Sequence, residues 1–166
     1  SVSFLTRLGD DKDGQWARST FERAGMDTSH CIVVPKALTM SACVTIGTKC
    51  MTRCCLMHKD ASLFELDVTP HLASIDLSRF DVVYTDGHQT DLALPVARRA
   101  AARGMRIVAD IEVLDDETRE LFEVATDVVA PAATIKALAE EADPGTAALT
   151  LATERPGKVV IATEGE

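Results

Sequence analysis

Short apolar runs separated by amphipathic segments dominate the second half of the chain. From Leu77 onward the runs "DVVY", "RIVA", "DVVA" and "KVVI" alternate with stretches such as "QTDLALPVARRAAARG", "DETRELFEVA" and "TIKALAEEA". Apolar runs without polar alternation are typical of parallel strands covered on both faces, and the amphipathic stretches are typical of crossover helices. Because such crossovers are right-handed, we expect a parallel sheet with helices on both of its faces.

The first thirty residues predict a strand, a loop and a helix. Residues 2–8, "VSFLTRL", have the character of a strand, and "GDDKDG" follows as a loop. Apolar residues that include Trp16 and Phe21 then recur at helical spacing, which predicts a helix from about Gln15 to Ala24. We expect Gly25 to end this helix, because glycine is the usual residue in a left-handed C-terminal cap.

A β-rich stretch interrupts this pattern. Apolar and polar residues alternate from Cys31 to Met57, and Pro35 and Gly47 divide the stretch into two or three short strands with a hairpin around "GTKC". The predicted fold class is therefore α/β: a three-layer α/β/α parallel sheet of Rossmann-like topology, formed by residues 1–30 and 63–166. Residues 31–62 form a small separate β-sheet in this prediction.

Composition narrows the functional classes. A chain of 166 residues with 46% apolar and 26% charged residues fits one globular domain, and the formal charge of -9 argues against a nucleic-acid partner. Arg98, Arg99, Arg103 and Arg106 fit the solvated face of a helix better than a binding patch. No stretch approaches the roughly 20 apolar residues of a transmembrane helix, and no leader is visible. We expect a soluble, cytoplasmic protein without a membrane partner.

Five cysteines, at positions 31, 43, 50, 54 and 55, lie in the first third of the chain. Their spacing is poor for zinc, although His30 and His58 are close enough in sequence to leave a metal site open. The alternation in "SACVTIGTKCMTRCCLM" favours small side chains that pack on strands. The odd count and the lack of a leader favour reduced thiols.

Polar residues follow most of the predicted strands. In a parallel sheet, ligands bind beyond the carboxyl ends of the strands, where carboxylates suit sugar hydroxyls or a nucleotide-bound Mg²⁺. Helix N-caps also use Asp and Thr at such places, and Asp11 is expected to be one of them. Asp110 and Glu112 lie two residues apart and hence on the same side of the pleat. The residues at the carboxyl ends of the predicted strands are Gly9, Asp10 and Asp11; Asp86, Gly87 and His88; Asp110 and Glu112; Pro131 to Thr134; and Thr163, Gly165 and Glu166.

The stretch "RLGDDKDGQWARSTFERAGMDTS" resembles the pattern of ribokinase-like (PfkB) carbohydrate kinases. The matching residues are Gly9, Asp10, Asp11, Gly14, Gly25, Asp27, Thr28 and Ser29. The order of later motifs is similar too: a β-rich insert near Thr39, a strand ending in "DG", then "VADIE", "ATDVVAP" and "VVIATEGE". The "SACVTI", "LSRFDVVYTDGH" and "DIE" segments look most like the ketohexokinase pattern. The resemblance covers essentially the whole chain. A dinucleotide-binding domain is disfavoured, because no Gly-x-Gly-x-x-Gly follows a predicted strand.

This resemblance implies a transferase that moves the γ-phosphoryl group of ATP onto a sugar-like alcohol with Mg²⁺. In the family, the carboxylate base and the amides that receive developing charge lie in a "GAGD" segment that would follow Glu166, and a sugar-gripping segment would precede Ser1. We therefore expect an internal segment of a kinase that is inactive alone, with no catalytic residue and no metal ligand of its own. The alternative is a non-catalytic, kinase-like dimerisation module.

The resemblance also assigns roles to individual residues. Thr39 and the strands after it would form a lid, spanning residues 31–62, that closes over the sugar and pairs with the lid of a second copy. The alternative for these strands is a small sheet packed on its own domain. A charged residue in place of Ile46 is expected to give monomers. The substrate-binding residues implied are Thr39, Asp86, His88, Asp110 and Glu112, with loop and cap roles as alternatives for the last four.

The resemblance implies that the nucleotide binds at the end of the last predicted strand. Thr163, Gly165 and Glu166 match the turn beneath the ATP phosphates. One departure lies nearby: family members often carry Asn-x-x-Glu after the "DVV" strand to organise magnesium and phosphate, whereas this chain has Ala132 and Ile135 at those positions.

Overall fold

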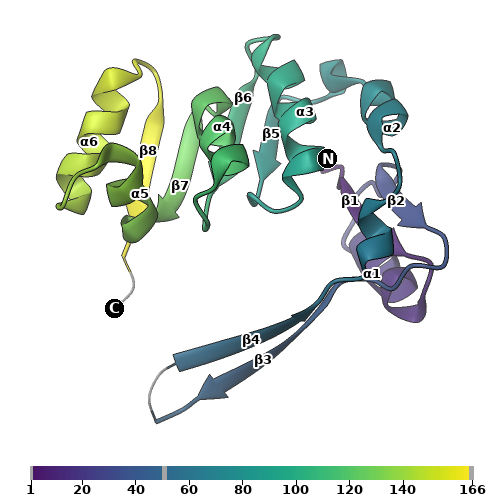
Figure 1. Cartoon of the computed structure of the whole chain (residues 1–166). Coiled ribbons are helices and arrows are strands. Elements are labelled where there is room, and N and C mark those ends of the chain that lie inside the picture. The colour runs from purple at the N-terminus through teal and green to yellow at the C-terminus, as the bar shows by residue number, and fades with distance from the viewer. Residues whose placement is uncertain (1, 50–51, 165–166) are drawn as a thin grey trace. The chain divides into compact units, whose positions relative to one another are not determined.

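The computed structural model describes residues 2–49 and 52–164 (Figure 1). The chain divides into two compact units, Ser1–Ile75 and Asp76–Glu166. Each unit has strands and helices of its own, so each is described by itself.

The first unit opens with a β-α-β segment. Strand β1 (Thr6–Gly9) pairs in parallel with β2 (Cys31–Val34), and helix α1 (Lys12–Arg23) connects them. The predicted strand over residues 2–8 is thus shorter and shifted toward Gly9, while Ser3 forms an isolated bridge with Asp27. Helix α1 begins earlier than predicted, because the Asp11 side chain accepts a hydrogen bond from the amide of Gly14 and so caps the first turn.

The predicted hairpin is confirmed. Strands β3 (Ser41–Gly47) and β4 (Thr52–His58) pair antiparallel, with Val44 opposite Cys55. No described residue of either strand is buried. The strand positions of Cys43, Cys54 and Cys55 are therefore confirmed, but the expectation that these side chains pack within the protein is wrong. The first unit continues with the 3-10 helix η1 (Ala61–Phe64) and helix α2 (Thr69–Ser74).

The second unit alternates strands with helices and ends on a strand. Its elements are the 3-10 helix η2 (Leu77–Arg79), β5 (Val82–Thr85), α3 (Thr90–Ala101), β6 (Arg106–Asp110), α4 (Asp116–Val124), β7 (Asp127–Pro131), α5 (Ala132–Ala139), α6 (Pro144–Glu154) and β8 (Val159–Thr163). The strands form one parallel sheet in the order β5-β6-β7-β8. The α/β fold class with a parallel sheet is confirmed.

One face of this sheet is buried and the other is open in the described residues. Ile107, Ala109, Val128 and Ala130 share the buried face and have no exposed surface, whereas Tyr84 on the other face is 64% exposed. The strand order explains the difference. When strands follow one another across a sheet in sequence order, every right-handed crossover places its helix on the same side. Helices α3 to α6 therefore cover one face of this unit, where both were expected (Figure 1).

Large side chains fill the layer between helices and sheet. The most deeply buried in this unit are Ile107, Ile111, Leu121, Phe122, Val128 and Ile135. None of the helices in the described part of the chain is long and apolar enough to cross a membrane.

Candidate functional site

The carboxyl end of β5 leads into a tight loop. The Asp86 carboxylate accepts a hydrogen bond from the amide of His88 at 3.0 Å, and the Thr85 hydroxyl accepts one from the amide of Gly87 at 3.2 Å. Gly87 has φ +70°, and a Cβ at this position would lie 2.7 Å from the backbone oxygen of Asp110. Glycine is therefore required where the loop rests on the end of β6. The loop presents the exposed side chains of Asp86 and His88 at this edge of the sheet.

The end of β6 brings a second pair of carboxylates to the same edge. Asp110 is the last residue of β6 and is half-buried, while Glu112 is exposed. Between them, Ile111 is fully buried and donates its amide to the oxygen of Val129 at 2.9 Å. Because Ile111 faces the core, the two acidic residues lie on the opposite side of the chain, as their spacing predicted.

Tyr84, on β5 near its carboxyl end, was not predicted as a site residue. Partial burial raises the pKa of its phenol above the ordinary value, and the negative charges of Asp110 and Asp86 raise it further. Val108 is the register partner of Tyr84, so Asp110, two residues further along β6, lies diagonally from Tyr84 on the same face of the sheet. A sequence signal was available, because Tyr84 lies in the predicted strand only two residues before Asp86.

The ends of β7 and β8 complete this edge of the sheet. Thr163 is exposed, is paired in register with Pro131, and its hydroxyl donates to the oxygen of Ala130 at 3.3 Å. One strand separates β8 from β6, so Thr163 lies roughly 10 Å from the end of β6 at the usual strand spacing. Gly165 and Glu166, predicted beside it, lie outside the described residues.

Helix caps differ along this edge. Asp115 caps α4 and Asp143 caps α6, each by accepting a backbone amide. No side-chain cap is formed at the start of α3 or α5, the two helices that follow β5 and β7 most closely. The starts of these two helices therefore differ from those of α4 and α6 in having no carboxylate cap.

Two positions at the start of α5 were noted as departures from the metal-organising motif. Ala132 begins the helix, and Ile135 is fully buried in the core. Thr134 is also buried, with its hydroxyl donating to the oxygen of Glu112 at 3.2 Å. These residues secure α5 against β6 and provide no metal ligand.

Thr39, the remaining predicted substrate-binding residue, belongs to the first unit. Its hydroxyl donates to Asp11 at 2.6 Å and accepts from the amide of Gly9 at 2.9 Å, and its own amide donates to Asp11 at 3.1 Å. The Thr39 hydroxyl thus makes two hydrogen bonds within the protein. The hydrogen bond from Thr39 is the main cause that holds the pKa of Asp11 below its ordinary value, and the amide of Gly14 adds to it.

The two glycines of the sequence motif have a steric role at this point. A Cβ on Gly9 would lie 2.2 Å from the oxygen of Ala37, and a Cβ on Gly14 would lie 2.2 Å from the oxygen of Gly9. Gly14 also approaches the Thr39 hydroxyl, which would lie 2.7 Å from the added atom. Gly9, Asp11 and Gly14 therefore hold the chain that leads into β3 against the start of α1.

A second carboxylate fixes the other root of the hairpin. Asp60, two residues after β4, accepts hydrogen bonds from the amide of Leu38 at 2.7 Å and from the amide and hydroxyl of Ser62 at 3.0 and 2.7 Å. The Leu38 amide is the largest cause that lowers the pKa of Asp60. The two ends of the hairpin are thus tied to each other and to η1.

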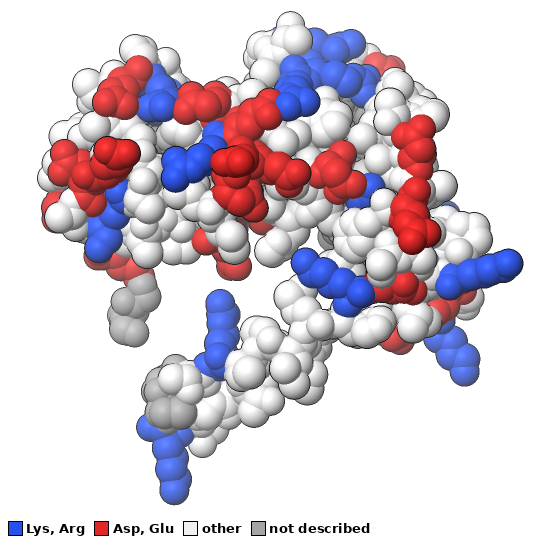
Figure 2. Space-filling model, viewed as in Figure 1, with Lys and Arg blue, Asp and Glu red and all other residues white. Residues whose placement is uncertain are grey.

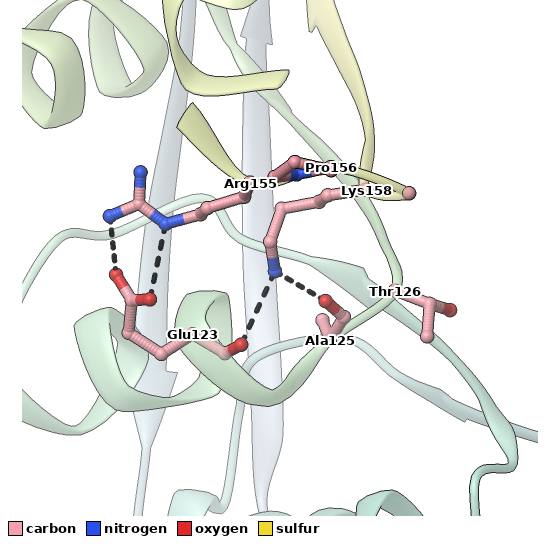
Figure 3. Close-up of a pocket in the computed structure, with 7 residues that line it drawn as sticks. Glu123, Ala125, Thr126, Arg155, Pro156 and Lys158 are labelled. Atoms are coloured by element: carbon pink, nitrogen blue, oxygen red, sulfur yellow. Dashed lines mark hydrogen bonds and ion pairs between the residues drawn. The ribbon is translucent and has the colours of Figure 1, made fainter. Parts of the chain in front are cut away.

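One pocket lies at the opposite, amino end of the strands (Figure 3). Its Lys158 ammonium donates to the backbone oxygens of Phe122 and Ala125 at the end of α4, and Arg155 forms an ion pair with Glu123 at 2.7 Å. Burial lowers the pKa of Lys158. These contacts satisfy the last carbonyls of α4, so the pocket has a structural role and lies away from the candidate site. It is lined by Glu123, Ala125, Thr126, Arg155, Pro156, Gly157 and Lys158.

Comparisons with known proteins were made at three levels. No family model matches the sequence, and no curated protein matches it. Solved structures do match. A PfkB protein from Polaromonas sp. JS666 has a TM-score of 0.77 at 20% identity, covering 99% of this chain and 61% of that one.

Two further solved structures match. A fructokinase from Xylella fastidiosa gives a TM-score of 0.72 at 20% identity, covering 92% of this chain and 52% of that one. A protein from E. coli assigned as a ribokinase II, solved with ATP and Mg²⁺, gives 0.77 at 18% identity, with 96% and 56% covered. This chain has the ribokinase-like fold. It spans a little over half the length of the structures that it matches.

Proposed function

We propose that this chain is part of an ATP-dependent kinase that transfers the γ-phosphoryl group to a hydroxyl of a sugar or sugar-like molecule. The observation that carries the proposal is the placement of Asp86 directly after β5 and of Asp110 at the end of the neighbouring strand β6, at the carboxyl edge of the sheet. Ligands of open α/β sheets bind at this edge. Carboxylates that are held there accept hydrogen bonds from the hydroxyl groups of a polyol.

The remaining edge residues divide the proposed site into two parts. Asp86, His88, Asp110 and Glu112 lie at the ends of β5 and β6, where we place the sugar. Thr163, together with Gly165 and Glu166, follows β8, where we place the phosphates of ATP. The amides at the start of α5, which have no side-chain cap, would add hydrogen-bond donors for a phosphate oxygen. We place Thr39 in the lid that closes over the sugar.

Magnesium would enter this site with ATP. Bound Mg²⁺ neutralises phosphate charge, and it commonly keeps few protein ligands when it binds a nucleotide. Among the described residues, no three His, Cys, Asp or Glu side chains are grouped closely enough to hold a metal ion. We assign no residue of this chain as a ligand of Mg²⁺, and we place the general base outside these 166 residues. The chain by itself is expected to turn over no ATP.

A second candidate function is a non-catalytic, kinase-like dimerisation module. The exposed hairpin favours it, because both of its faces lack cover in the described residues. In both functions the hairpin joins two copies of the chain into a homodimer, and reduced thiols suit the cytoplasm, where we place the protein. The two candidates differ in one property, which is phosphoryl transfer by the full-length gene product.

The test is therefore an assay of ADP release by the full-length protein with panels of sugars and nucleosides. With the substrate that responds, Asp110→Asn should raise KM about 10- to 100-fold, because a hydrogen bond to a charged group is lost. Asp81→Asn is the matched control, since Asp81 precedes β5 at the other end of the same sheet. Equal kinetics for the two variants would contradict the proposed site. No transfer to any acceptor, by a protein that is dimeric in light scattering, would favour the dimerisation module.

A further inference from the structure

The imidazole rings of His30 and His71 lie against each other in the first unit. Their centroids are 5.9 Å apart, and their planes are inclined at 79°. His30 lies in the turn before β2, and His71 lies in α2, so the contact joins two elements that are far apart in the sequence. The sequence left a metal site open near His30 and His58. In the structure the ring that contacts His30 is that of His71, and the proposed function uses neither of the two.

The backbone holds each of the two histidines in place. The Asp27 carboxylate accepts a hydrogen bond from the amide of Ser29 at 2.9 Å, which fixes the turn that carries His30. Leu72 is buried and anchors α2 in the core, so the position of the preceding residue, His71, is fixed as well. Bringing the two rings together therefore costs little additional backbone entropy.

One nitrogen of this pair is buried without a partner. The Nε2 atom of His71 has no hydrogen-bond partner among the described residues. Buried polar atoms are nearly always satisfied by protein, by water or by an ion, so this atom requires an explanation. A neutral imidazole nitrogen is a common metal ligand, and a second imidazole lies beside it. Imidazole pairs suit ions of the zinc type far better than magnesium or calcium.

The distance between the rings is close to the one that a shared ion requires. With Zn–N bonds of about 2.0 Å and tetrahedral angles, two imidazoles on one ion have their centroids about 5 Å apart. A side-chain movement of roughly 1 Å from the observed 5.9 Å is enough to reach this arrangement. Among the described residues, no three His, Cys, Asp or Glu side chains form a complete group of ligands. Water would therefore fill the remaining positions.

Cys31 follows His30 directly but is not suited to be a third ligand. Its Sγ donates to the backbone oxygen of Phe4 at 3.4 Å. Burial raises the pKa of the Cys31 thiol, which disfavours the thiolate that binds metals. The exposed thiols of the hairpin, among them Cys54 and Cys55, are free and could compete for the same ion. An experiment must separate them from the histidine pair.

The charge of the surroundings favours a cation. Asp27 and Asp67 come shortly before the two histidines in the sequence, and the Asp67 carboxylate accepts the amide of Thr69 at 3.0 Å. That hydrogen bond is the largest cause that lowers the pKa of Asp67, so the carboxylate remains ionised. The net charge of -9 adds an attraction of longer range. Figure 2 shows Asp and Glu over much of the visible surface outside the hairpin.

We propose that His30 and His71 together bind one divalent ion of the zinc type, each through one ring nitrogen, with water as the other ligands. This ion is separate from the Mg²⁺ that would enter with ATP, and the proposal does not depend on kinase activity. Because the ion binds the folded chain, it would tie the turn before β2 to α2 and stabilise the first unit.

The experiment measures Zn²⁺ binding to the full-length protein by isothermal titration calorimetry, with the thiols reduced. It compares His30→Gln and His71→Gln with His58→Gln. His58 is the matched control, because it lies on β4 with Cys54 and Cys55. Co²⁺ then replaces Zn²⁺ as a spectroscopic probe, since thiolate ligands give intense near-ultraviolet charge-transfer bands and imidazoles do not. Circular dichroism verifies the fold of each variant. If a variant does not fold, broadening of histidine ring signals by Co²⁺ identifies the ligands in the unaltered protein.

We expect the unaltered protein and His58→Gln to bind Zn²⁺ equally, and each of the other two variants to bind it about ten-fold more weakly or worse. The Co²⁺ spectrum should lack thiolate bands, and saturating Zn²⁺ should raise the Tm by about 3 °C or more. Thiolate bands together with weaker binding by His58→Gln would move the site to the hairpin and overturn the proposal. Equal binding by all variants, loss in only one of the two histidine variants, or no binding at all would overturn it as well.

Discussion

Ile107 and Ile46 lie on strands of the same chain and have opposite surroundings. Ile107 is in the middle of the β5–β8 sheet and has no exposed surface, whereas Ile46 on the hairpin is 69% exposed. The sheet buries one face under its own helices, so its apolar residues contribute to folding. The hairpin covers neither face, so its apolar residues can contribute only by association. The same residue type therefore has two different roles, and substitutions can separate them.

The largest effect is expected at Ile107. Truncation by Ile107→Ala removes buried methylene groups and leaves a cavity, which should lower the free energy of unfolding by about 3 kcal/mol. The matched change Ile46→Ala should alter it by less than about 0.5 kcal/mol, because the side chain is already in water. Urea denaturation followed by circular dichroism measures both. Similar losses for the two variants would mean that the hairpin packs on its own chain.

A somewhat smaller loss is expected where the hairpin joins the first unit. Gly14→Ala would place a Cβ 2.2 Å from the oxygen of Gly9, so backbone must shift. We expect a loss of about 2 kcal/mol from such overpacking. Gly145→Ala is the control, because a Cβ there would meet only Asp143 at 3.4 Å near the start of α6. The control should be neutral or gain about 0.5 kcal/mol from helix propensity. Equal stability of the two variants in thermal unfolding would refute the steric role of Gly14.

Association is expected to change without a change in folding at Ile46. Ile46→Asp places a charge on the hairpin face that also carries Val44 and Met57, and it should weaken the proposed dimer by about 30-fold or more, giving monomers at micromolar concentration. Leu56→Asp puts the same charge on the opposite face and should leave the dimer in place. Sedimentation or light scattering across a dilution series distinguishes them. A dimer that survives Ile46→Asp and dissociates in Leu56→Asp would place the interface on the face of Leu56 instead.

The smallest expected effect is a loss of local stability at the two ends of the hairpin as the pH falls. The pKa values of Asp11 and Asp60 are lowered by hydrogen bonds in the folded state, from 3.8 in each case. Such groups stabilise the fold above their unfolded pKa, and that contribution is lost as the pH falls through the folded values. Between about pH 5 and pH 2 the amides of Leu38 and Thr39 should therefore lose protection against hydrogen exchange. Asp11→Asn should flatten this pH dependence for Thr39, whereas Asp81→Asn should not.

Much of the fold was predictable from the sequence because it depends on local pattern. The apolar runs gave the strands of the second unit, the alternation around "GTKC" gave the hairpin, and the position of Asp11 gave the helix cap. The faces of the sheet were not predictable in this way. Which face the helices cover depends on the order of β5 to β8 in the sheet, and the pattern of apolar residues within each segment does not reveal that order. Trp16 was expected on the apolar face of its helix, yet it is 67% exposed. Phe21 of the same helix packs against Phe4, with the two ring centroids 4.5 Å apart.

The candidate site was predictable to a similar degree. Strand ends are visible in a sequence, so Asp86, Asp110 and Thr163 could be named and placed at one edge. Tyr84 was missed because it lies inside a strand, where an aromatic residue is read as packing. The contacts of Thr39 were also missed, since its partner Asp11 lies 28 residues away. The lid boundaries at residues 31–62 stay a prediction, although β2 pairs with β1 rather than with the hairpin.

Asp11 has a further consequence for how the first unit opens. One carboxylate accepts the amide of Gly14 in α1 and both the amide and the hydroxyl of Thr39 before β3. A local opening that displaces Asp11 from the helix start also frees the hairpin root, because the same carboxylate holds both segments. The two segments should therefore form one cooperative unit of local unfolding, and a ligand that orders either of them would restrict the motion of the other.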